Sequence, residues 1–334
     1  MLIRFTGVVL GAVLGTTALA APAVADPALA ASVDVVTAEQ ASKKIMIFDP
    51  AVASWNGSGA TKWAWSPTSA NGFSAQADGA SAEASTSAAG WSNPSDMRLR
   101  SNSHHGGQVL VTAASGGFLG VASFPAGKRK WSVAVPGADN PHAAELLPNG
   151  NVAAAASHGG WIRLYAASQG PNATKHAQYD LPGGHGVLWD PQGSVLWAIG
   201  DNHLVALKVG GTAANPTLSE ARKVALPSKG GHDLQPVYGN KDRLWITTSS
   251  QVYQFSKSTG AFSTDYAHAA SANRTSVKSI GNHPQTGQLI EAKPKAGCRT
   301  TWCTDTIDFF GADAKRTRTG AEFYKARFWY AAYQ

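Results

Sequence analysis

The chain has 334 residues, of which 43% are hydrophobic and 15% are charged, with 35 glycines and a net charge of +7. This length suits one repetitive all-β domain as well as two smaller domains, and many small residues with little charge favour short strands over long helices. The positive balance favours anionic partners, but the sequence lacks the dense Lys/Arg clusters of nucleic-acid-binding proteins, so we expect no nucleic-acid partner.

The N-terminus is typical of an export signal. Arg4 supplies a positive charge, an apolar run follows, and "AVA" before Asp26 gives a small-residue cleavage site near Ala25. We therefore expect residues 1–25 to be removed and residues 26–334 to form a secreted, extracellular, monomeric β-propeller domain. The apolar run is short and no later stretch is long enough to span a bilayer, so we expect no membrane span.

The mature N-terminus predicts three strands, at residues 33–40, 43–50 and 61–67. They match the second, third and outer strands of a sheet that lacks its innermost strand. Residues 66–92 then break the pattern, because this segment is rich in Ser, Ala and Gly and too polar to form a packed strand. We interpret it as an excursion loop. Of its two possible roles, a tolerated surface insertion is favoured over a lid that covers the channel.

A repeat runs from there to the C-terminus. The heads of the innermost strands recur at intervals of 43 to 47 residues, at Asp96, His142, His185, His232, Lys278 and Lys325. Each interval contains further strand-like runs separated by Gly, Asn, Asp and Pro, which is the pattern of a four-stranded propeller blade. After residues 325–333 the chain stops, so the N-terminal strands complete that last blade. The sequence predicts an all-β, six-bladed propeller closed by both ends of the chain.

Inner strands line the channel of a propeller, and side chains alternate along a strand, so the six heads are expected to share one level. Two residues further along, the same face carries Arg98 and Arg327 among apolar residues. Trp91, shortly before Asp96, would flank the channel mouth and suit a sugar ring.

Two roles are open for His142, His185 and His232. Three converging imidazoles can hold a divalent metal, or one of them can act as a general base near neutral pH. Asp96, Arg98, Lys278, Lys325 and Arg327 would then bind an anionic group, with Asp96 orienting His142 or a lysine. Alternatively, the histidines hydrogen-bond loop backbones between neighbouring blades and have no ligand.

Cys298 and Cys303 bracket "RTTW" near the C-terminus. In an oxidising compartment a local disulfide is the expected state, and a thiolate metal site is the weaker alternative because no second cysteine pair exists.

The motifs "PSDMRLR", "NPHAAELLPNGN", "GGHGVLWDP", "GGHDLQPV", "VKSIGN", "WCTDTIDFF" and "FYKARFW" together resemble an uncharacterised family of secreted bacterial proteins, a domain-of-unknown-function family. The resemblance covers nearly the whole mature chain and implies a propeller and export, but no activity. At the level of fold alone, the histidine-lined channel is similar to propeller lyases that carry a metal or a catalytic histidine on the axis.

We therefore expect a secreted propeller that binds an anionic small molecule or polysaccharide, an acidic glycan first of all, at the channel mouth. A lyase or hydrolase dependent on the three histidines, with or without a divalent metal, is the enzymatic form of this hypothesis. The alternative is a non-catalytic binding or scaffold protein of the cell envelope.

Overall fold

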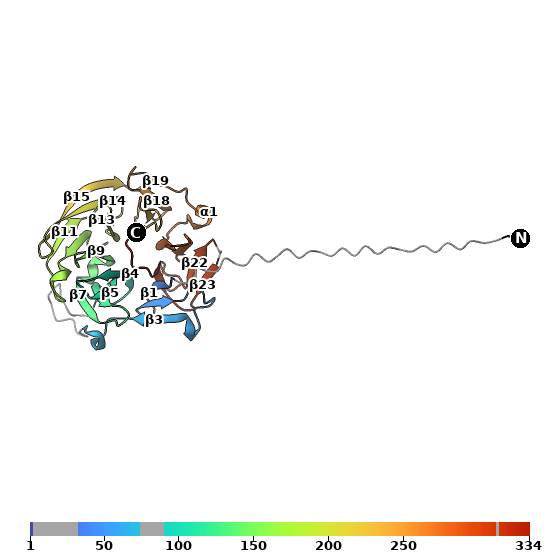
Figure 1. The fold of residues 1–334 in the computed structure, drawn as a ribbon, viewed down its shortest axis with the longest axis horizontal. Helices are drawn as coiled ribbons and strands as arrows, with labels where there is room; N and C mark the ends of the chain where they lie inside the picture. The colour runs from blue at the N-terminus through green and yellow to red at the C-terminus, as the bar shows by residue number, and fades with distance from the viewer. Residues whose placement is uncertain (3–32, 74–89, 312–313) are drawn as a thin grey trace.

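The computed structural model describes residues 1–2, 33–73, 90–311 and 314–334. These residues form six four-stranded antiparallel sheets around a central axis, and Figure 1 shows them as a ring seen down that axis. The predicted six-bladed propeller is confirmed. The expected export signal lies outside the described residues apart from Met1 and Leu2, as does the part of the expected excursion loop at residues 74–89.

Each blade runs from its innermost to its outermost strand. Blade I consists of β24 (Phe323–Phe328), β1 (Val35–Glu39), β2 (Lys44–Phe48) and β3 (Thr61–Trp65). Blade II consists of β4 (Pro94–Asn102), β5 (Gly107–Ala114), β6 (Phe118–Ser123) and β7 (Arg129–Ala134). Blade III consists of β8 (Pro141–Leu146), β9 (Val152–Ala156), β10 (Trp161–Tyr165) and β11 (His176–Asp180).

The other three blades follow in chain order. Blade IV consists of β12 (Gly186–Asp190), β13 (Val195–Ile199), β14 (His203–Gly211) and β15 (Pro216–Ala225). Blade V consists of β16 (Leu234–Pro236), β17 (Arg243–Thr247), β18 (Val252–Ser256) and β19 (Phe262–Ser263). Blade VI consists of β20 (Ser279–Asn282), β21 (Leu289–Ala292), β22 (Thr306–Phe310) and β23 (Ala314–Thr317). Short helices lie in the connections, at Ser58–Ala60, Ser69–Asn71, Gly137–Asp139, Ala167–Gln169 and α1 (Ala269–Ala272).

The ring is closed by pairing the two ends of the described chain. In blade I the C-terminal strand β24 pairs antiparallel with β1, with Val35 opposite Phe328 and Val36 opposite Arg327. This pairing confirms the predicted closure, and it removes two strand edges that would otherwise be open.

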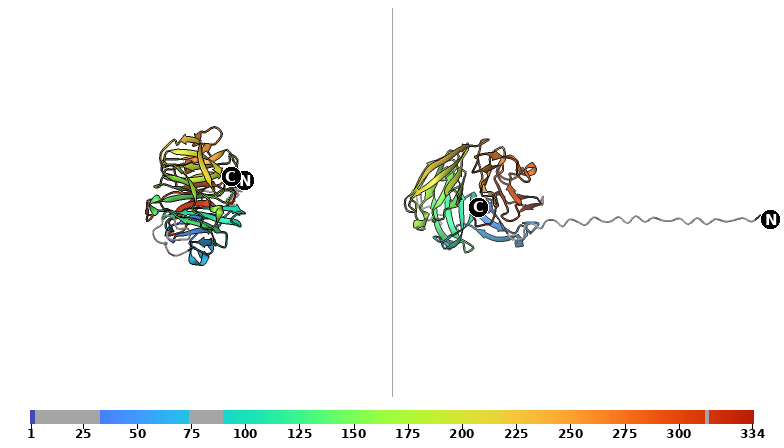
Figure 2. Two further views of the ribbon diagram at one scale, coloured as in Figure 1. Left: turned by 90° about the vertical axis from the view of Figure 1, so that its left-hand side faces the viewer. Right: turned by 45° about the horizontal axis from the view of Figure 1, so that its top comes forward.

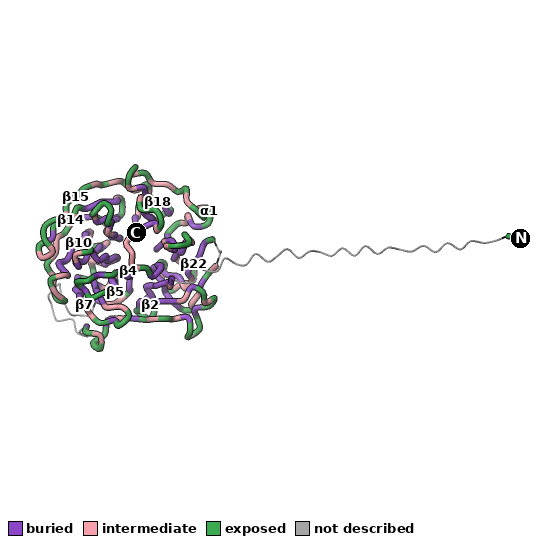
Figure 3. The backbone as a smooth tube through the Cα atoms, in the orientation of Figure 1, coloured by how far each residue is buried: buried purple, intermediate pink, exposed green. Residues whose placement is uncertain are grey.

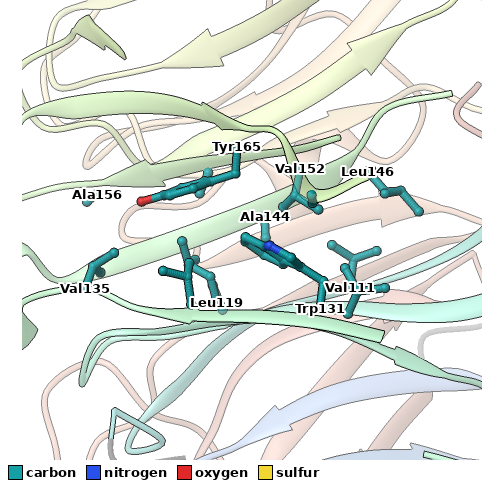
Figure 4. Packing of buried hydrophobic residues seen from close by; sticks show 14 of the residues in the cluster. Val111, Leu119, Trp131, Val135, Ala144, Leu146, Val152, Ala156 and Tyr165 are labelled. Carbon is teal, nitrogen blue, oxygen red and sulfur yellow. The ribbon is translucent and has the colours of Figure 1, made fainter. Parts of the chain in front are cut away.

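Apolar side chains fill the seams between neighbouring blades. Between blades II and III, Trp131 of β7 and Tyr165 of β10 have ring centroids 5.5 Å apart and pack with Val, Leu and Ala side chains of the adjoining strands (Figure 4). The inner and middle strands are buried along most of their length because both faces of a blade pack against neighbouring blades, whereas the outer rim is exposed (Figure 3). Most tryptophans fill these seams, which holds the inner strands in place.

The C-terminal segment departs from the expected strand. We predicted an inner strand over residues 325–333, but β24 ends at Phe328, and the C-terminus lies near the centre of the ring (Figures 1 and 2). The carbonyl oxygen of Ala332 accepts hydrogen bonds from Arg100 and Tyr238, and the hydroxyl of Tyr333 donates to the carbonyl of Leu146 at 2.7 Å. Arg100 and Leu146 lie in the last part of β4 and β8, and Tyr238 follows the end of β16, so the tail covers that end of the channel.

Candidate functional site

A cavity opens at the other end of the channel, where the inner strands begin. Its volume is about 640 Å³, which lies within the range typical of small-molecule sites. Polar side chains and glycines line most of it. The side chains around its floor and rim include Gln40, His142, His185, Asp201, His232, Lys278, Trp302 and Tyr324.

The three predicted histidines lie together in this cavity. The ring centroids of His142 and His185 are 4.1 Å apart with the planes 15° from parallel, and those of His185 and His232 are 4.6 Å apart. The glycine before His232 permits this close approach of blades, because a Cβ atom on Gly231 would lie 2.3 Å from the carbonyl oxygen of Gly200.

Tyr324 is the member of the cluster that the sequence analysis missed. Its hydroxyl lies 2.8 Å from His232 Nε2 and 3.2 Å from His142 Nδ1. Ser279 Oγ accepts a hydrogen bond from the backbone N–H of Ala326, as Asp233 Oδ2 does from Ile280 in the preceding blade, so Lys325 is the counterpart of Ser279. Tyr324 is then the counterpart of Lys278, and it lines the cavity where the repeat predicted Lys325.

The expected single ring of six heads is therefore wrong for two positions. Lys325 lies one layer deeper, and so does Asp96, whose Oδ2 accepts a hydrogen bond from Ala144 N–H as Asp233 Oδ2 does from Ile280 N–H. Both side chains are fully buried and neither lines the cavity. Lys278 does lie at the level of the histidines, with Nζ 3.4 Å from His232 Nε2.

The deeper layer is a network of buried ion pairs, here called the ionic layer. It consists of Asp96, Arg98, Arg100, Glu145, Asp233, Lys325 and Arg327. Arg327 bridges two blades, because its Nη2 atom lies 2.6 Å from Asp96 Oδ1 and 3.0 Å from Asp233 Oδ1. Lys325 Nζ lies 3.5 Å from Asp233 Oδ1.

The ionic layer closes the channel beneath the cavity. The predicted ligand residues Asp96, Arg98 and Arg327 have protein partners there, and Arg98 also donates to Gln235 and to two backbone carbonyls. Burial alone would raise the pKa of Asp96, but Arg327, Arg98 and Lys325 hold it well below its usual range. Asp96 therefore remains a carboxylate.

The histidines are uncharged at neutral pH. Burial lowers the pKa of His185 to about 3, with Lys325 and Lys278 contributing. Burial and neighbouring positive charges also hold the pKa values of His142 and His232 well below the ordinary value. Burial and the charge of Lys325 lower the pKa of Lys278 to about 8, so its ammonium form predominates at pH 7.

The hydrogen-bond partner of His185 assigns the proton on its ring. His185 Nδ1 lies 3.0 Å from the Gly183 carbonyl oxygen, which can only accept, so the proton of the neutral ring is on Nδ1 and Nε2 is unprotonated. The Tyr324 hydroxyl lies between His142 Nδ1 and His232 Nε2, so it can donate to one ring while it accepts from the other.

The histidine trio does not fit a metal ion. His142 and His185 stack face to face, so their in-plane lone pairs do not converge on one point, and Tyr324 occupies a nitrogen of His142 and of His232. Within residues 1–2, 33–73, 90–311 and 314–334, no group of three His, Cys, Asp or Glu side chains is placed to hold a metal. The cavity thus offers general-base and hydrogen-bonding groups.

The expected position of Trp91 at the channel mouth is also wrong. Its Nε1 donates to the Lys43 carbonyl, and its ring packs edge-on against Trp65 and Phe118 in the seam between blades I and II. The tryptophan that lines the cavity is Trp302, which lies between the two cysteines. Cys298 and Cys303 form the predicted disulfide, with Cα atoms 5.9 Å apart.

Comparison with known proteins defines the relationship of the chain, not its activity. A protein of unknown function from Bacteroides caccae has 9% identity and a TM-score of 0.51, covering 87% of this chain and 93% of its own. A crystal structure titled as the mitotic checkpoint complex contains a chain with 11% identity and a TM-score of 0.48, covering 90% and 77%. No curated protein matches in sequence. Among the described residues, no helix has the length and apolar character needed to cross a bilayer. The family model for DUF6528, a family of unknown function, matches residues 20–332, and the chain belongs to that family.

Proposed function

We propose that this protein binds a small acidic saccharide in the cavity at the channel mouth. The observation that carries the proposal is the position of Lys278 beside neutral imidazoles, directly above the ionic layer. One acidic side chain, Asp201, also lines the cavity, where it lies beside Gly183. That layer contains four basic side chains and three carboxylates, so the basic side chains outnumber the acids below the cavity. An anion at Lys278 would therefore meet a favourable potential in a site that is partly shielded from water.

The chemistry of the lining fits a sugar better than an inorganic anion. Asn140, Ser157 and Ser249 supply amide and hydroxyl groups around the three histidines, and such groups exchange hydrogen bonds with sugar hydroxyls. A phosphate ion would leave most of the cavity unfilled. A saccharide of one or two rings carrying a carboxylate matches the volume and the single lysine at the histidine level.

Lys278→Gln tests the anion contact. We expect this variant to weaken the binding of digalacturonate, measured by titration calorimetry, by tenfold or more, because a charge-assisted hydrogen bond in a shielded site is lost. Lys223→Gln is the matched control, since Lys223 is exposed on the outermost strand β15. Equal affinity of the wild-type protein and Lys278→Gln would contradict the proposal.

The pH dependence of binding is a separate prediction. The ammonium form of Lys278 binds the anion, and its pKa in the ligand-free protein is about 8. The affinity for digalacturonate is therefore expected to fall as pH rises through 8, with about tenfold weaker binding at pH 9 than at pH 7. Lys278→Gln should lose this dependence, and a wild-type affinity that is constant from pH 7 to 9 would argue against Lys278 as the anion contact.

The unprotonated Nε2 of His185 favours β-elimination as a second candidate function. One imidazole would take the proton α to the carboxylate, the C–H electrons would form the new double bond, and the glycosidic C–O bond would break. Tyr324, which burial keeps protonated by raising its pKa, would protonate the leaving oxygen. Lys278 would stabilise the charge on the carboxylate.

A screen of acidic oligosaccharides for an unsaturated product that absorbs in the ultraviolet tests this activity. We expect His185→Ala to abolish turnover, with circular dichroism checking that the fold is kept. If digalacturonate binds but no acidic oligosaccharide is cleaved, the cavity is a binding site only. If nothing binds there, a scaffold role through the blade edges is favoured.

A further inference from the structure

The six-residue disulfide loop carries an aromatic side chain to the cavity. Trp302 lies between Cys298 and Cys303 and is 40% exposed, although nearly all other tryptophans pack within seams. Its ring lines the cavity together with Gln40, and its Nε1 donates to Gln40 Oε1 at 3.0 Å. This hydrogen bond fixes the indole edge and leaves part of its surface open.

Several contacts fix the position of this loop. Gln40 is itself held, because its amide Nε2 donates to the Pro94 carbonyl at 3.2 Å and its backbone N–H donates to the Glu322 carbonyl at 2.9 Å. Thr304, directly after Cys303, exchanges two backbone hydrogen bonds with Phe323, the neighbour of Tyr324 in β24. The indole and the Tyr324 hydroxyl are thus positioned from the same inner strand.

An exposed indole at the edge of a polar cavity has an unfavourable contact with water that a ligand can remove. The C–H face of a pyranose ring is apolar while its hydroxyls point outward, so it can cover an indole and still form hydrogen bonds with the polar lining. The other side chains that line the cavity supply imidazoles, a phenol, amides, hydroxyls, an ammonium and the carboxyl group of Asp201. Trp302 therefore supplies the apolar surface that distinguishes a sugar from a simple carboxylic acid.

We propose that Trp302, held by the Cys298–Cys303 disulfide loop and by Gln40, is the residue that stacks on a sugar ring and gives the cavity its specificity for saccharides. This inference rests on the proposed function for the acidic group of the ligand but not for the sugar ring. A neutral sugar can bind through Trp302 without Lys278. The two proposals can therefore fail separately.

The test uses digalacturonate and its neutral counterpart galactobiose, with affinities measured by titration calorimetry. Trp302→Ala is expected to weaken the binding of both sugars by about tenfold, as truncation of a central aromatic contact does. Trp302→Phe should restore part of the affinity. Tyr330→Ala is the control, because Tyr330 is similarly exposed, at 38%, but lies against Tyr238 near the covered end of the channel.

Each outcome decides between the two proposals. If only galactobiose binds and Trp302→Ala weakens it, the stacking role stands and the acidic ligand is wrong. If digalacturonate binds equally to the wild-type protein and Trp302→Ala, the stacking role is overturned and the acidic ligand stands. If neither sugar binds, both are overturned.

The disulfide is tested on the wild-type protein. Reduction by dithiothreitol, verified by mass spectrometry after alkylation, is expected to lower the affinity for digalacturonate severalfold, because the loop loses its covalent closure. Unchanged affinity of the reduced protein would overturn the role of the disulfide in holding Trp302.

Discussion

Asp96→Asn is expected to lower the free energy of unfolding by roughly 3–5 kcal/mol, as the removal of one partner from a buried ion pair does. The carboxylate of Asp96 is fully buried and accepts two hydrogen bonds from the Arg327 guanidinium and one from the backbone N–H of Ala144. The amide would leave Arg327 with the charge of Asp233 alone. The loss should affect the whole fold, because this ion pair network connects three blades. Asp96 lies in β4 of blade II, Arg327 lies in β24 of blade I, and Asp233 directly precedes β16 of blade V.

Urea unfolding at pH 7 measures this loss. Asp34→Asn is the matched control, since Asp34 forms an ion pair with Lys62 at 2.7 Å whose side chains are 30% and 45% exposed. Such surface pairs contribute about 0–1 kcal/mol. Similar losses in the two variants would mean that the ionic layer does not hold the inner strands together.

The architecture could be predicted because a propeller repeats one local pattern. Each blade needs four short strands with turn residues between them, and both are visible in the sequence at a regular spacing. The closure of the ring was predicted because the leftover strands at the two ends add up to one blade. The end of β24 at Phe328 was missed, because the apolar "WYAAY" that follows also suits the covering of a channel.

The site was predicted only in part, because the height of a residue along an inner strand depends on aligning the repeat to the exact residue. His142, His185, His232 and Lys278 lie where the repeat places them.

Asp96 and Lys325 were aligned one residue too far along. The hydrogen bonds between blades make Asp96 the counterpart of Asp233 and Lys325 the counterpart of Ser279. Tyr324 is therefore the residue of blade I at the histidine level. Intervals of 46 and 47 residues both occur in the repeat and fit either alignment, so the spacing alone did not separate them.

Trp302 was missed for a different reason. It belongs to a loop outside the repeat, so its direction depends on how blade VI packs against the β24 strand and not on strand alternation. Trp91 was expected at the mouth from its distance along the chain to Asp96, but three neighbouring aromatic rings, those of Trp65, Phe73 and Phe118, form a cluster that buries its ring in a seam.

The protein is expected to lose stability as pH falls from 7 to 5, because three histidines stay neutral in the fold. An unfolded chain takes up a proton at each histidine below pH 6.5, whereas His185 in the folded protein has a pKa of about 3. The lowered pKa of each histidine therefore has no cost above pH 6.5, where the unfolded chain is also neutral. Below pH 6.5 the free energy of unfolding decreases as pH falls, because only the unfolded chain takes up the proton. For His185 this loss is about 2 kcal/mol between pH 7 and pH 5.

One carboxyl acts in the opposite direction. Burial raises the pKa of Glu291 to about 8, so the folded protein binds a proton there that the unfolded chain releases above its ordinary pKa of 4.5. The resulting stabilisation grows as pH falls from 8. Between pH 7 and pH 5 it is about as large as the stability that is lost through one histidine. Asp96 and Asp233, whose pKa values are lowered, lose their contribution only below the ordinary aspartate range. Between pH 7 and pH 5 the histidines and Glu291 therefore act in opposite directions, while the two aspartates contribute little to the change.

His185→Gln tests this directly, because a comparison with the wild-type protein cancels the contribution of Glu291. Urea unfolding at pH 7, 6 and 5 should give a decrease in stability that is smaller in the variant by up to about 2 kcal/mol. His268→Gln is the control for a histidine substitution away from the cavity, because His268 is exposed and directly precedes α1. If His185→Gln has the same pH dependence as the wild-type protein, the imidazole is protonated in the fold near its ordinary pKa. The cavity would then hold a positively charged histidine beside Lys278, and His185 could not serve as the base in β-elimination.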